Sequence, residues 1–264
     1  MTFNLCQHFS QYFSLSIADN ETLLQEVYKI RYEVYCEELN YEPPENFPDG
    51  MESDIYDKHS IHCLLKHKST GTYAGCVRIV TPHNRGTATA YPWQKFASSI
   101  IYPYSQYEWH NNICEVSRLA VRKQFRKRKG DGILPFGDVS PDAQQGQRRF
   151  PLIAMSLYWA AFCMALNLNL DIFAIMEPRL ARHLRRCGLS YCLISNLFEL
   201  HGKRGIFYTK PPEQLQHLDS DTYDFFYLLN KTIAGGLFEE GYISSPFAIP
   251  FLKFPDEVVC VEQR

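Results

Sequence analysis

Charged residues suited to acid–base chemistry stand at the edges of apolar segments in the first half of the chain. They are Arg31, Glu52, Asp54, Asp57, Arg78, Glu115 and Arg118. A charge beside an apolar segment must find a partner or face a cavity, because burying it alone is costly. These arginines and carboxylates are therefore expected to form an ion-pair network. Such a network stabilises a fold, and it also lines many active sites, where a carboxylate can serve as a general base.

Hydrophobic periodicity predicts the elements that would position these residues. Apolar residues recur every three or four positions over residues 20–39, which indicates an amphipathic helix that carries Arg31. Residues 62–66 and 72–81 are rich in strand formers and flank a Lys-Ser-Thr-Gly segment, which is typical of an antiparallel hairpin. The second strand of this hairpin would carry Arg78.

A third segment with strand character, residues 113–121, carries a Glu-Val-Ser-Arg motif. Successive side chains of a strand point to opposite faces of the sheet. Glu115 and Ser117 would therefore share one face and Arg118 would lie on the other, unless a β-bulge intervenes. Each of these side chains would then need a partner or a cavity on its own face.

The second half of the chain alternates between helical and extended patterns. The expected elements are a long apolar helix over 151–168, a buried strand over 170–176, an amphipathic helix over 178–187, and strands near 191–200 and 205–209. The pattern predicts a mixed α/β domain of residues 1–210. Residues 211–264 are expected to form a partly helical C-terminal extension.

Composition and cysteine spacing exclude several classes of protein. The 264 residues are 45% apolar and 21% charged, which is typical of a compact globular chain. The longest apolar stretch is about 16 residues, short of the roughly 20 that span a membrane, and the N-terminus is unlike a secretory signal. We therefore expect a cytoplasmic protein without an integral membrane segment. The nine cysteines are scattered and never spaced Cys-x-x-Cys, which predicts free thiols and no metal site.

The net charge of −2 conceals an uneven distribution of charge. Residues 1–60 carry a net charge of −9 and residues 118–210 a net charge of +10. The acidic segment is suited to a cationic substrate, and the basic segment to an anionic partner. The densest basic run, residues 122–129, holds six bases in eight residues. It can be interpreted as a solvated loop, a nucleic-acid patch, or a docking site for an acidic or phosphate-bearing carrier.

As an ordered set, the charged motifs resemble those of a known group of acyltransferases. The set consists of Arg31 with Tyr35, Glu52-x-Asp54-x-x-Asp57, Arg78 and Glu115-x-x-Arg118. It is similar to motifs of the autoinducer (acyl-homoserine-lactone) synthases and the N-acyl amino acid synthases. Two segments resemble more closely the acyltransferases associated with the bacterial PEP-CTERM/exosortase system. They are Glu-Val-Ser-Arg-Leu-Ala-Val at 115–121 and Met-Glu-Pro-Arg-Leu-Ala-Arg at 176–182.

This resemblance implies a GNAT-like acyltransferase fold, with a central mixed, mostly antiparallel sheet flanked by helices. It implies a bacterial N-acyltransferase whose donor is an acyl thioester on acyl carrier protein or coenzyme A. The acceptor would be the amine of an amino acid or a related small molecule. No permanently bound cofactor is expected.

Two alternatives to this function stay open. One is an acyl-homoserine-lactone synthase that uses S-adenosylmethionine. Tyr35 and Tyr41 stand where autoinducer synthases usually carry Phe and Trp, which favours an N-acyl amino acid as the product. The other alternative is a non-catalytic protein that binds acyl chains or nucleic acid. No recognised nucleic-acid-binding motif accompanies the basic run, so nucleic acid is not expected as a partner.

The candidate site residues follow from the resemblance and from the chemistry of acyl transfer. The catalytic candidates are Glu115 as the first and Glu52 as the second choice of general base, with Arg118 to orient carboxylates. Backbone N–H groups near Leu119 and Val121 are expected to stabilise the oxyanion. The candidate substrate-binding residues are Arg31, Tyr35, Asp54, Asp57, Arg78, Ser117, Leu119 and Val121.

The phosphate-binding turn of GNAT enzymes reads Arg/Gln-x-x-Gly-x-Gly/Ala and leads directly into a helix. Here residues 127–132 have the glycines but begin with Lys, and about 18 residues precede the next predicted helix. This departure favours acyl carrier protein over coenzyme A, because the acidic surface of the carrier suits the basic segment. The candidate carrier- or phosphopantetheine-binding residues are Arg126, Arg128, Gly130, Arg179 and Arg182.

Overall fold

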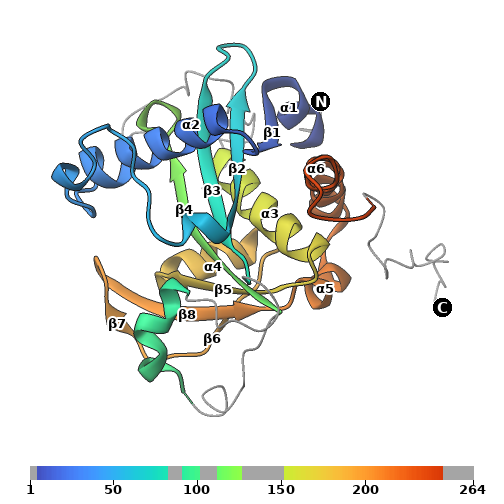
Figure 1. Ribbon diagram of the computed structural model, residues 1–264. Coiled ribbons are helices and arrows are strands. Elements are labelled where there is room, and N and C mark those ends of the chain that lie inside the picture. The colour runs from blue at the N-terminus through green and yellow to red at the C-terminus, as the bar shows by residue number, and fades with distance from the viewer. Residues whose placement is uncertain (1–4, 83–90, 102–111, 127–151, 246–264) are drawn as a thin grey trace, which may run out of the picture.

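The computed structural model describes residues 5–82, 91–101, 112–126 and 152–245. Within these residues, seven strands of an eight-stranded sheet follow the order β1-β2-β3-β4-β5-β8-β6, and β7 pairs with β8 off this path. The strands are β1 Phe13–Ile17, β2 Ser60–His67, β3 Tyr73–Val80, β4 Ile113–Val121, β5 Asp171–Met176, β6 Cys192–Leu193, β7 Phe198–Glu199 and β8 Lys203–Thr209. The α-helices are α1 Leu5–Tyr12, α2 Glu21–Arg31, α3 Leu152–Asn167, α4 Pro178–Arg186, α5 Pro211–Gln214 and α6 Ser220–Glu239. This mostly antiparallel sheet flanked by helices confirms the predicted fold class (Figure 1).

The sheet opens between its two central strands, β4 and β5. These strands run parallel, whereas the other described neighbours are antiparallel. They pair over only three positions, from Ile113 opposite Asp171 to Glu115 opposite Phe173. Figure 1 shows β4 and β5 leading away from each other beyond this short pairing. Glu115 therefore lies at the point where the two strands diverge.

The two faces of the sheet carry different layers (Figure 1). α3 and α6 cover one face, where Trp159, Phe162 and Phe226 form ring contacts in the main core. α3 is apolar nearly all round because it is buried between the sheet and α6. α2 covers the other face, where Val27 and Ile30 pack against side chains of β2, β3 and β4. This second face is the one that carries the charged motifs.

The predicted helix over residues 20–39 is present but changes type part-way. Asn20 caps α2, because its side chain accepts a hydrogen bond from the backbone N–H of Leu23 at 3.0 Å. After α2 the chain continues as a π-helix, Tyr32–Glu38. A π-helix has a wider turn than an α-helix, and such segments often occur at functional sites. This one brings Tyr35 against β4.

β4 contains a β-bulge in its pairing with β3. Ser117 lies opposite Arg78 and Ala120 opposite Cys76, so β4 holds one residue more than β3 between these pairs. Arg118 in the bulge has a φ of 51°, in the left-handed region that most residues other than glycine avoid. The bulge turns Arg118 toward the face that α2 covers. The simple alternation that would place Arg118 on the opposite face is therefore wrong.

The chain termini add to the sheet and to the core. α1 and β1, which the sequence patterns did not predict, supply an edge strand and its flanking helix. α6 packs against α3, and its Phe225, Leu229 and Ile233 belong to the main core. The predicted boundary at residue 210 thus falls between elements that share one core, and residues 246–264 lie outside the described residues.

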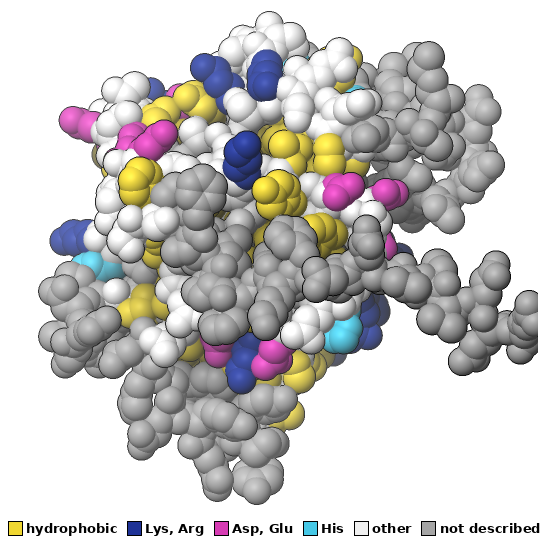
Figure 2. All heavy atoms as spheres, turned by 90° about the vertical axis from the view of Figure 1, so that its right-hand side faces the viewer, with side chains coloured by type: hydrophobic (Ala, Val, Ile, Leu, Met, Phe, Trp, Pro, Cys, Tyr) yellow, Lys and Arg dark blue, Asp and Glu magenta, His cyan; other side chains and the backbone are white. Residues whose placement is uncertain are grey.

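On the side that includes α1 and α6, apolar, basic and acidic side chains are interspersed (Figure 2).

Candidate active site

Arg31, at the end of α2, lies at the centre of the predicted ion-pair network. Its side chain is buried, and its Nε donates a hydrogen bond to Glu52 Oε2 at 2.5 Å. Its Nη1 donates to Asp57 Oδ1 at 2.7 Å. The loop that carries both carboxylates is held against α2, because the Glu52 N–H donates to the carbonyl of Tyr28 at 3.1 Å. Burial acts to lower the pKa of Arg31, but Glu52 and Asp57 raise it above its usual range.

Arg78 on β3 joins the same acidic loop from the sheet. Its Nη1 donates to Asp54 Oδ1 at 2.6 Å and to Asp57 Oδ1 at 2.7 Å. Its Nε donates to Ser117 Oγ on β4 at 3.1 Å. Burial acts to raise the pKa of Asp57, yet Arg31 and Arg78 hold this pKa well below its usual range. Asp57 is therefore a charged bridge between α2 and β3, and it is too weak a base to take a proton from an amine.

Arg118 links the network to β4. Its Nε donates to Glu52 Oε1 at 3.2 Å, and its Nη2 donates to Glu42 Oε1 at 2.8 Å. Its guanidinium carbon lies 5.2 Å from the ring centre of Tyr35. Glu52 thus accepts hydrogen bonds from two arginines, one through each of its oxygens. Both oxygens of the second candidate base are therefore committed to the network.

Glu115 lies apart from these ion pairs, at the divergence of β4 and β5. It is 2% exposed, and its Oε2 accepts a hydrogen bond from the backbone N–H of Trp93 at 2.8 Å. Burial raises the pKa of Glu115 to about 8, although the Trp93 N–H and the charges of Arg78 and Arg118 act in the opposite direction. A carboxyl with this pKa is partly ionised near neutral pH and is a stronger base than an ordinary carboxylate. Glu115 is thus well suited to take a proton.

Two residues of the site were not predicted from the sequence. Trp93 belongs to a 3-10 helix, Pro92–Ser99, in a region without clear periodicity. His62 on β2 lies opposite Arg78 in the hairpin and is buried beside Asp57. Burial, reinforced by the neighbouring arginines, lowers the pKa of His62 to about 3, so its imidazole is neutral. The hairpin register could have indicated His62, whereas no sequence signal indicates the contact of Trp93.

Tyr35 connects the π-helix to the bulge of β4. Its hydroxyl donates a hydrogen bond to the carbonyl of Leu119 at 2.8 Å. Burial raises the pKa of Tyr35 to about 12, so the hydroxyl keeps its proton at neutral pH. One edge of β4 pairs with β3 as far as Val121. The other edge, toward β5, has no strand partner beyond Glu115 in the described part of the chain, so backbone groups there, apart from the Leu119 carbonyl, are not used by strand pairing.

The network, the bulge and Glu115 all lie in one segment that matches a known protein family. Residues 30–134 match the family model described as an acetyltransferase (GNAT) domain. This segment is similar to a GNAT acetyltransferase domain, and the protein is an acyltransferase. The predicted enzyme class is thereby confirmed. The finer association with the PEP-CTERM/exosortase system stays a prediction.

Solved structures resemble this acyltransferase in fold. LasI, an acyl-homoserine-lactone (AHL) synthase, is 17% identical over 81% of this chain and 93% of its own, with a TM-score of 0.52. TofI, in a ternary complex with an inhibitor and MTA, is 16% identical over 83% and 99%, with a TM-score of 0.54. BjaI, a CoA-dependent acyl-homoserine lactone synthase with SAM and isopentyl-CoA, is 17% identical over 81% and 88%, with a TM-score of 0.52. At these identities the likeness concerns the fold, and no curated protein matches the chain.

The acidic first segment of the acyltransferase pairs with basic residues of β4 and the turn that follows. Arg122 donates to Glu33 Oε2 at 2.7 Å and to Glu26 Oε1 at 2.8 Å. Arg126 forms an ion pair with Glu38 of the π-helix. These three carboxylates therefore neutralise arginines of the same chain. That the acidic segment serves a cationic substrate stays a prediction. Arg126, a candidate for carrier binding, is already engaged.

The remaining carrier-binding candidates lie on α4 or outside the described residues. Arg128 and Gly130 fall outside them. Arg179 and Arg182 are exposed on α4, and no residue of the described ranges forms an ion pair with them. Arg185 of the same helix is also exposed. Of the predicted carrier-binding residues that the structure describes, those without an ion pair are therefore on α4.

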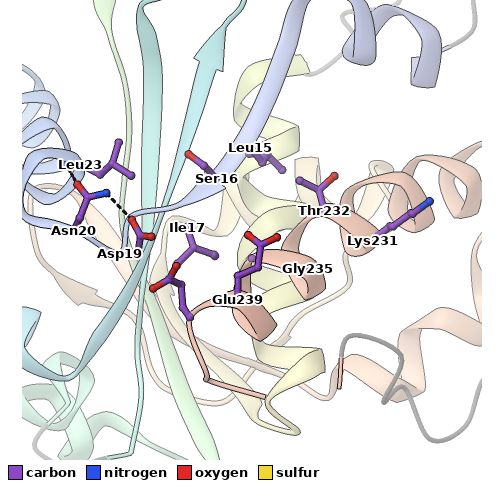
Figure 3. A pocket seen from close by; sticks show the side chains of 12 residues that line it. Leu15, Ser16, Ile17, Asp19, Asn20, Leu23, Lys231, Thr232, Gly235 and Glu239 are labelled. Atoms are coloured by element: carbon purple, nitrogen blue, oxygen red, sulfur yellow. Dashed lines mark hydrogen bonds between the residues drawn. The ribbon is translucent and has the colours of Figure 1, made fainter. Parts of the chain in front are cut away.

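A cavity of about 580 Å³ lies between β1 and α6, and none of the predicted site residues lines it (Figure 3). Asp19 and Asn20 line it after β1, and Lys231 and Glu239 line it from α6.

Among the residues that the structure describes, no cluster of His, Cys, Asp or Glu is placed to hold a metal ion. No helix in these ranges is long and apolar enough to cross a membrane. The cysteines of the described residues are free thiols, as predicted.

Proposed function

We propose that the protein is an N-acyltransferase that moves a fatty acyl group from a thioester on acyl carrier protein or coenzyme A to the amine of an amino acid or a related small molecule. The observation that carries this proposal is the position of Glu115, a buried carboxyl with a pKa of about 8 where β4 and β5 diverge. The unpaired edge of β4 offers backbone groups that can hold an extended thioester arm. In this arrangement Glu115, the base for the acceptor amine, would lie next to the thioester at the end of the donor's extended arm.

In the proposed reaction the acceptor nitrogen attacks the thioester carbonyl carbon directly. The acceptor ammonium first gives a proton to Glu115, directly or through one water. As the C–N bond forms, the carbonyl oxygen becomes an oxyanion, and backbone N–H groups of β4 near Leu119 and Val121 stabilise it by roughly a few kcal/mol. The C–S bond then breaks, the carrier thiolate leaves and takes the surplus proton from the attacking nitrogen, and the product is an amide.

The network of arginines and carboxylates has a positioning role in this proposal. Arg31 and Asp57 fix the acidic loop to α2, and Arg78 fixes the same loop to β3. Glu52 and Glu42 hold the side chain of Arg118 on the face where the acceptor would bind. A held guanidinium can orient a carboxylate of the acceptor at little cost in side-chain entropy.

The rate of acyl transfer should depend on pH through Glu115. Only the ionised carboxylate accepts a proton, so kcat/KM should rise about tenfold per pH unit below the pKa of about 8 and level off above it. Steady-state rates from about pH 6 to about pH 9.5 give this profile. Because the acceptor amine also titrates, two acceptors with different amine pKa values are compared. An inflection that moves with the amine, instead of staying near pH 8, would contradict the role of Glu115.

A product assay tests the proposed function. The purified protein is incubated with a long-chain acyl carrier protein, an amino acid mixture and S-adenosylmethionine, and organic extracts are analysed by mass spectrometry. An N-acyl amino acid formed by the native protein, and not by the Glu115→Gln variant, is the expected result and identifies the acceptor. An acyl lactone would support an AHL synthase instead. Saturable carrier binding without any product would support a non-catalytic protein.

The second candidate function is synthesis of an acyl-homoserine lactone from S-adenosylmethionine. The likeness of fold to LasI and BjaI favours it. Against it, Tyr35 uses its hydroxyl to hold the carbonyl of Leu119, and the Phe usual in autoinducer synthases lacks that hydroxyl.

The proposal of an N-acyltransferase also includes a cytoplasmic location and an association with the exosortase system. Both of these rest on sequence features.

Charge reversal on α4 should weaken docking of the acyl carrier protein. The double variant Arg179→Glu with Arg182→Glu is expected to raise KM for a long-chain acyl carrier protein about tenfold or more, because it repels the acidic carrier. It should leave KM for a short thioester mimic unchanged. Lys29→Glu with Lys231→Glu, at exposed positions on other helices, is the matched control. Equal effects on both donors would count against docking at α4.

A further inference from the structure

Each half of the sheet carries a segment that lies at the end where β4 and β5 are apart. β8 pairs with β5 as far as Gly205, opposite Met176, so the turn between β7 and β8 lies past the open end of β5. On the other half, the hydroxyl of Tyr35 donates to the carbonyl of Leu119 near the open end of β4. Figure 1 shows this turn and the segment after α2 on the same side of the molecule. A contact between them therefore joins the two halves.

The two segments meet at Tyr41 and His201. The rings of these residues are stacked, with their centres 4.1 Å apart and their planes at 11°. Tyr41 is fixed to the β4 half, because its backbone N–H donates to the carbonyl of Tyr35 at 2.8 Å. His201 is part of the turn between β7 and β8, and so belongs to the β5 half. We call the stacked pair of Tyr41 and His201 the clasp.

The backbone is strained on both sides of the clasp. Asn40, the residue before Tyr41, has a φ of 52°, and His201 has a φ of 50°. Residues other than glycine rarely adopt this left-handed region, and those that do cluster at ligand clamps and switch segments. His201 is exposed and Tyr41 is half-buried, so the two rings can part without opening the core. The clasp is therefore a local contact that can be made and broken.

We propose that the clasp is a gate that opens to admit the acyl donor between β4 and β5. This inference rests on the proposed function, in which the donor arm lies along the unpaired edge of β4. Within the described residues, pairing of β4 with β5 from Ile113 to Glu115 closes the other end of this edge. α3 packs against both strands and covers the face behind them. A donor attached to a carrier would thus enter at the end that the clasp spans.

A disulfide in place of the clasp tests the gate. Tyr41→Cys with His201→Cys is made in a Cys192→Ser background, because Cys192 is an exposed thiol. The protein is oxidised, and its mass shows whether the disulfide has formed. The oxidised form should associate with long-chain acyl carrier protein about tenfold or more slowly, because the required opening is prevented, and a reductant should restore the rate.

A control disulfide and an opened clasp complete the design. Glu199→Cys with Lys203→Cys joins opposite positions of β7 and β8 within one half of the sheet, and should leave association unchanged in both redox states. His201→Ala removes one ring and should raise the association rate about threefold or more, since every molecule is then open. His217→Ala, at an exposed position after α5, is its matched control. The result for His201→Ala stands whether or not the disulfide forms.

The outcomes distinguish the gate from a fixed brace and from a failure of the proposed function. Association at the same rate with the disulfide closed and reduced would overturn the gate, and so would a rate in His201→Ala no higher than the native rate. In both cases the rings would only brace the sheet, and acyl transfer by the native protein would be unaffected. If the native protein neither bound the carrier nor acylated an amine, the proposed function itself would fail, and the gate with it.

Discussion

Replacing Glu115 by Gln is expected to reduce kcat/KM by about 10²- to 10⁴-fold, the usual contribution of a general base. Glutamine has nearly the same shape as glutamate, and its amide oxygen can still accept the hydrogen bond from the Trp93 N–H. The packing around residue 115 should therefore be kept. The amide cannot take a proton from the acceptor amine, so the ammonium form would no longer be activated. Steady-state rates with acyl carrier protein as donor measure the loss.

The same substitution is expected to stabilise the protein at alkaline pH. The pKa of Glu115 is about 8 in the folded protein, against an ordinary value of 4.5. Between these two values the folded state holds a proton that the unfolded state has lost, so the free energy of unfolding falls as pH rises from about 4.5 through 8. Glutamine does not titrate. Near pH 8.5 the variant should be more stable than the native protein by up to about 5 kcal/mol, and near pH 4 the two should be similar.

Urea unfolding at several pH values tests this combination of lost activity and gained stability. Glu213→Gln removes a carboxylate at an exposed position of α5 and serves as the control, with native rates and native stability expected at each pH. If Glu115→Gln turned over at the native rate, Glu115 would have no role as the base. A lower stability of this variant at alkaline pH would show that the native carboxyl is solvated rather than buried.

The elements that present the site could be predicted because each has a strong local pattern. The hairpin of β2 and β3 follows from two strand-forming runs around a turn, and β4 has the bounds Ile113–Val121 that the sequence indicates. The ion-pair network was predicted for a general reason, since buried charges must be paired. Its members Arg31, Arg78 and Asp57 do meet, although they are up to 47 residues apart.

Features that depend on contacts between distant segments could not be predicted in this way. The bulge at Arg118 has no glycine to mark its positive φ, so strand alternation gave the wrong face. Trp93 meets Glu115 from a segment with no periodicity. Net charge alone also does not show which acidic residues are paired within the chain, as Glu33 is with Arg122. In each case tertiary contact decided the outcome.

The largest change in stability is expected at the buried pair of Arg31 and Glu52. Arg31→Met removes one partner and leaves buried carboxylates with fewer donors, which should lower the free energy of unfolding by about 3–5 kcal/mol. Glu52→Leu should cost a similar amount, because Arg31 then loses its closest acceptor. Urea unfolding at neutral pH measures both variants.

The double variant Arg31→Met with Glu52→Leu should be less destabilised than the sum of the two single variants. In it, Asp57 still has Arg78 and Arg118 still has Glu42, so no buried charge is left without a partner. We expect a coupling energy of about 1–3 kcal/mol from this cycle. The same cycle at the partly exposed pair of Arg122 and Glu33 is the control and should give about 1 kcal/mol or less. Additive effects at the buried pair would mean that Arg31 and Glu52 act independently, and the network would then not be the unit that fixes the acidic loop beside Glu115.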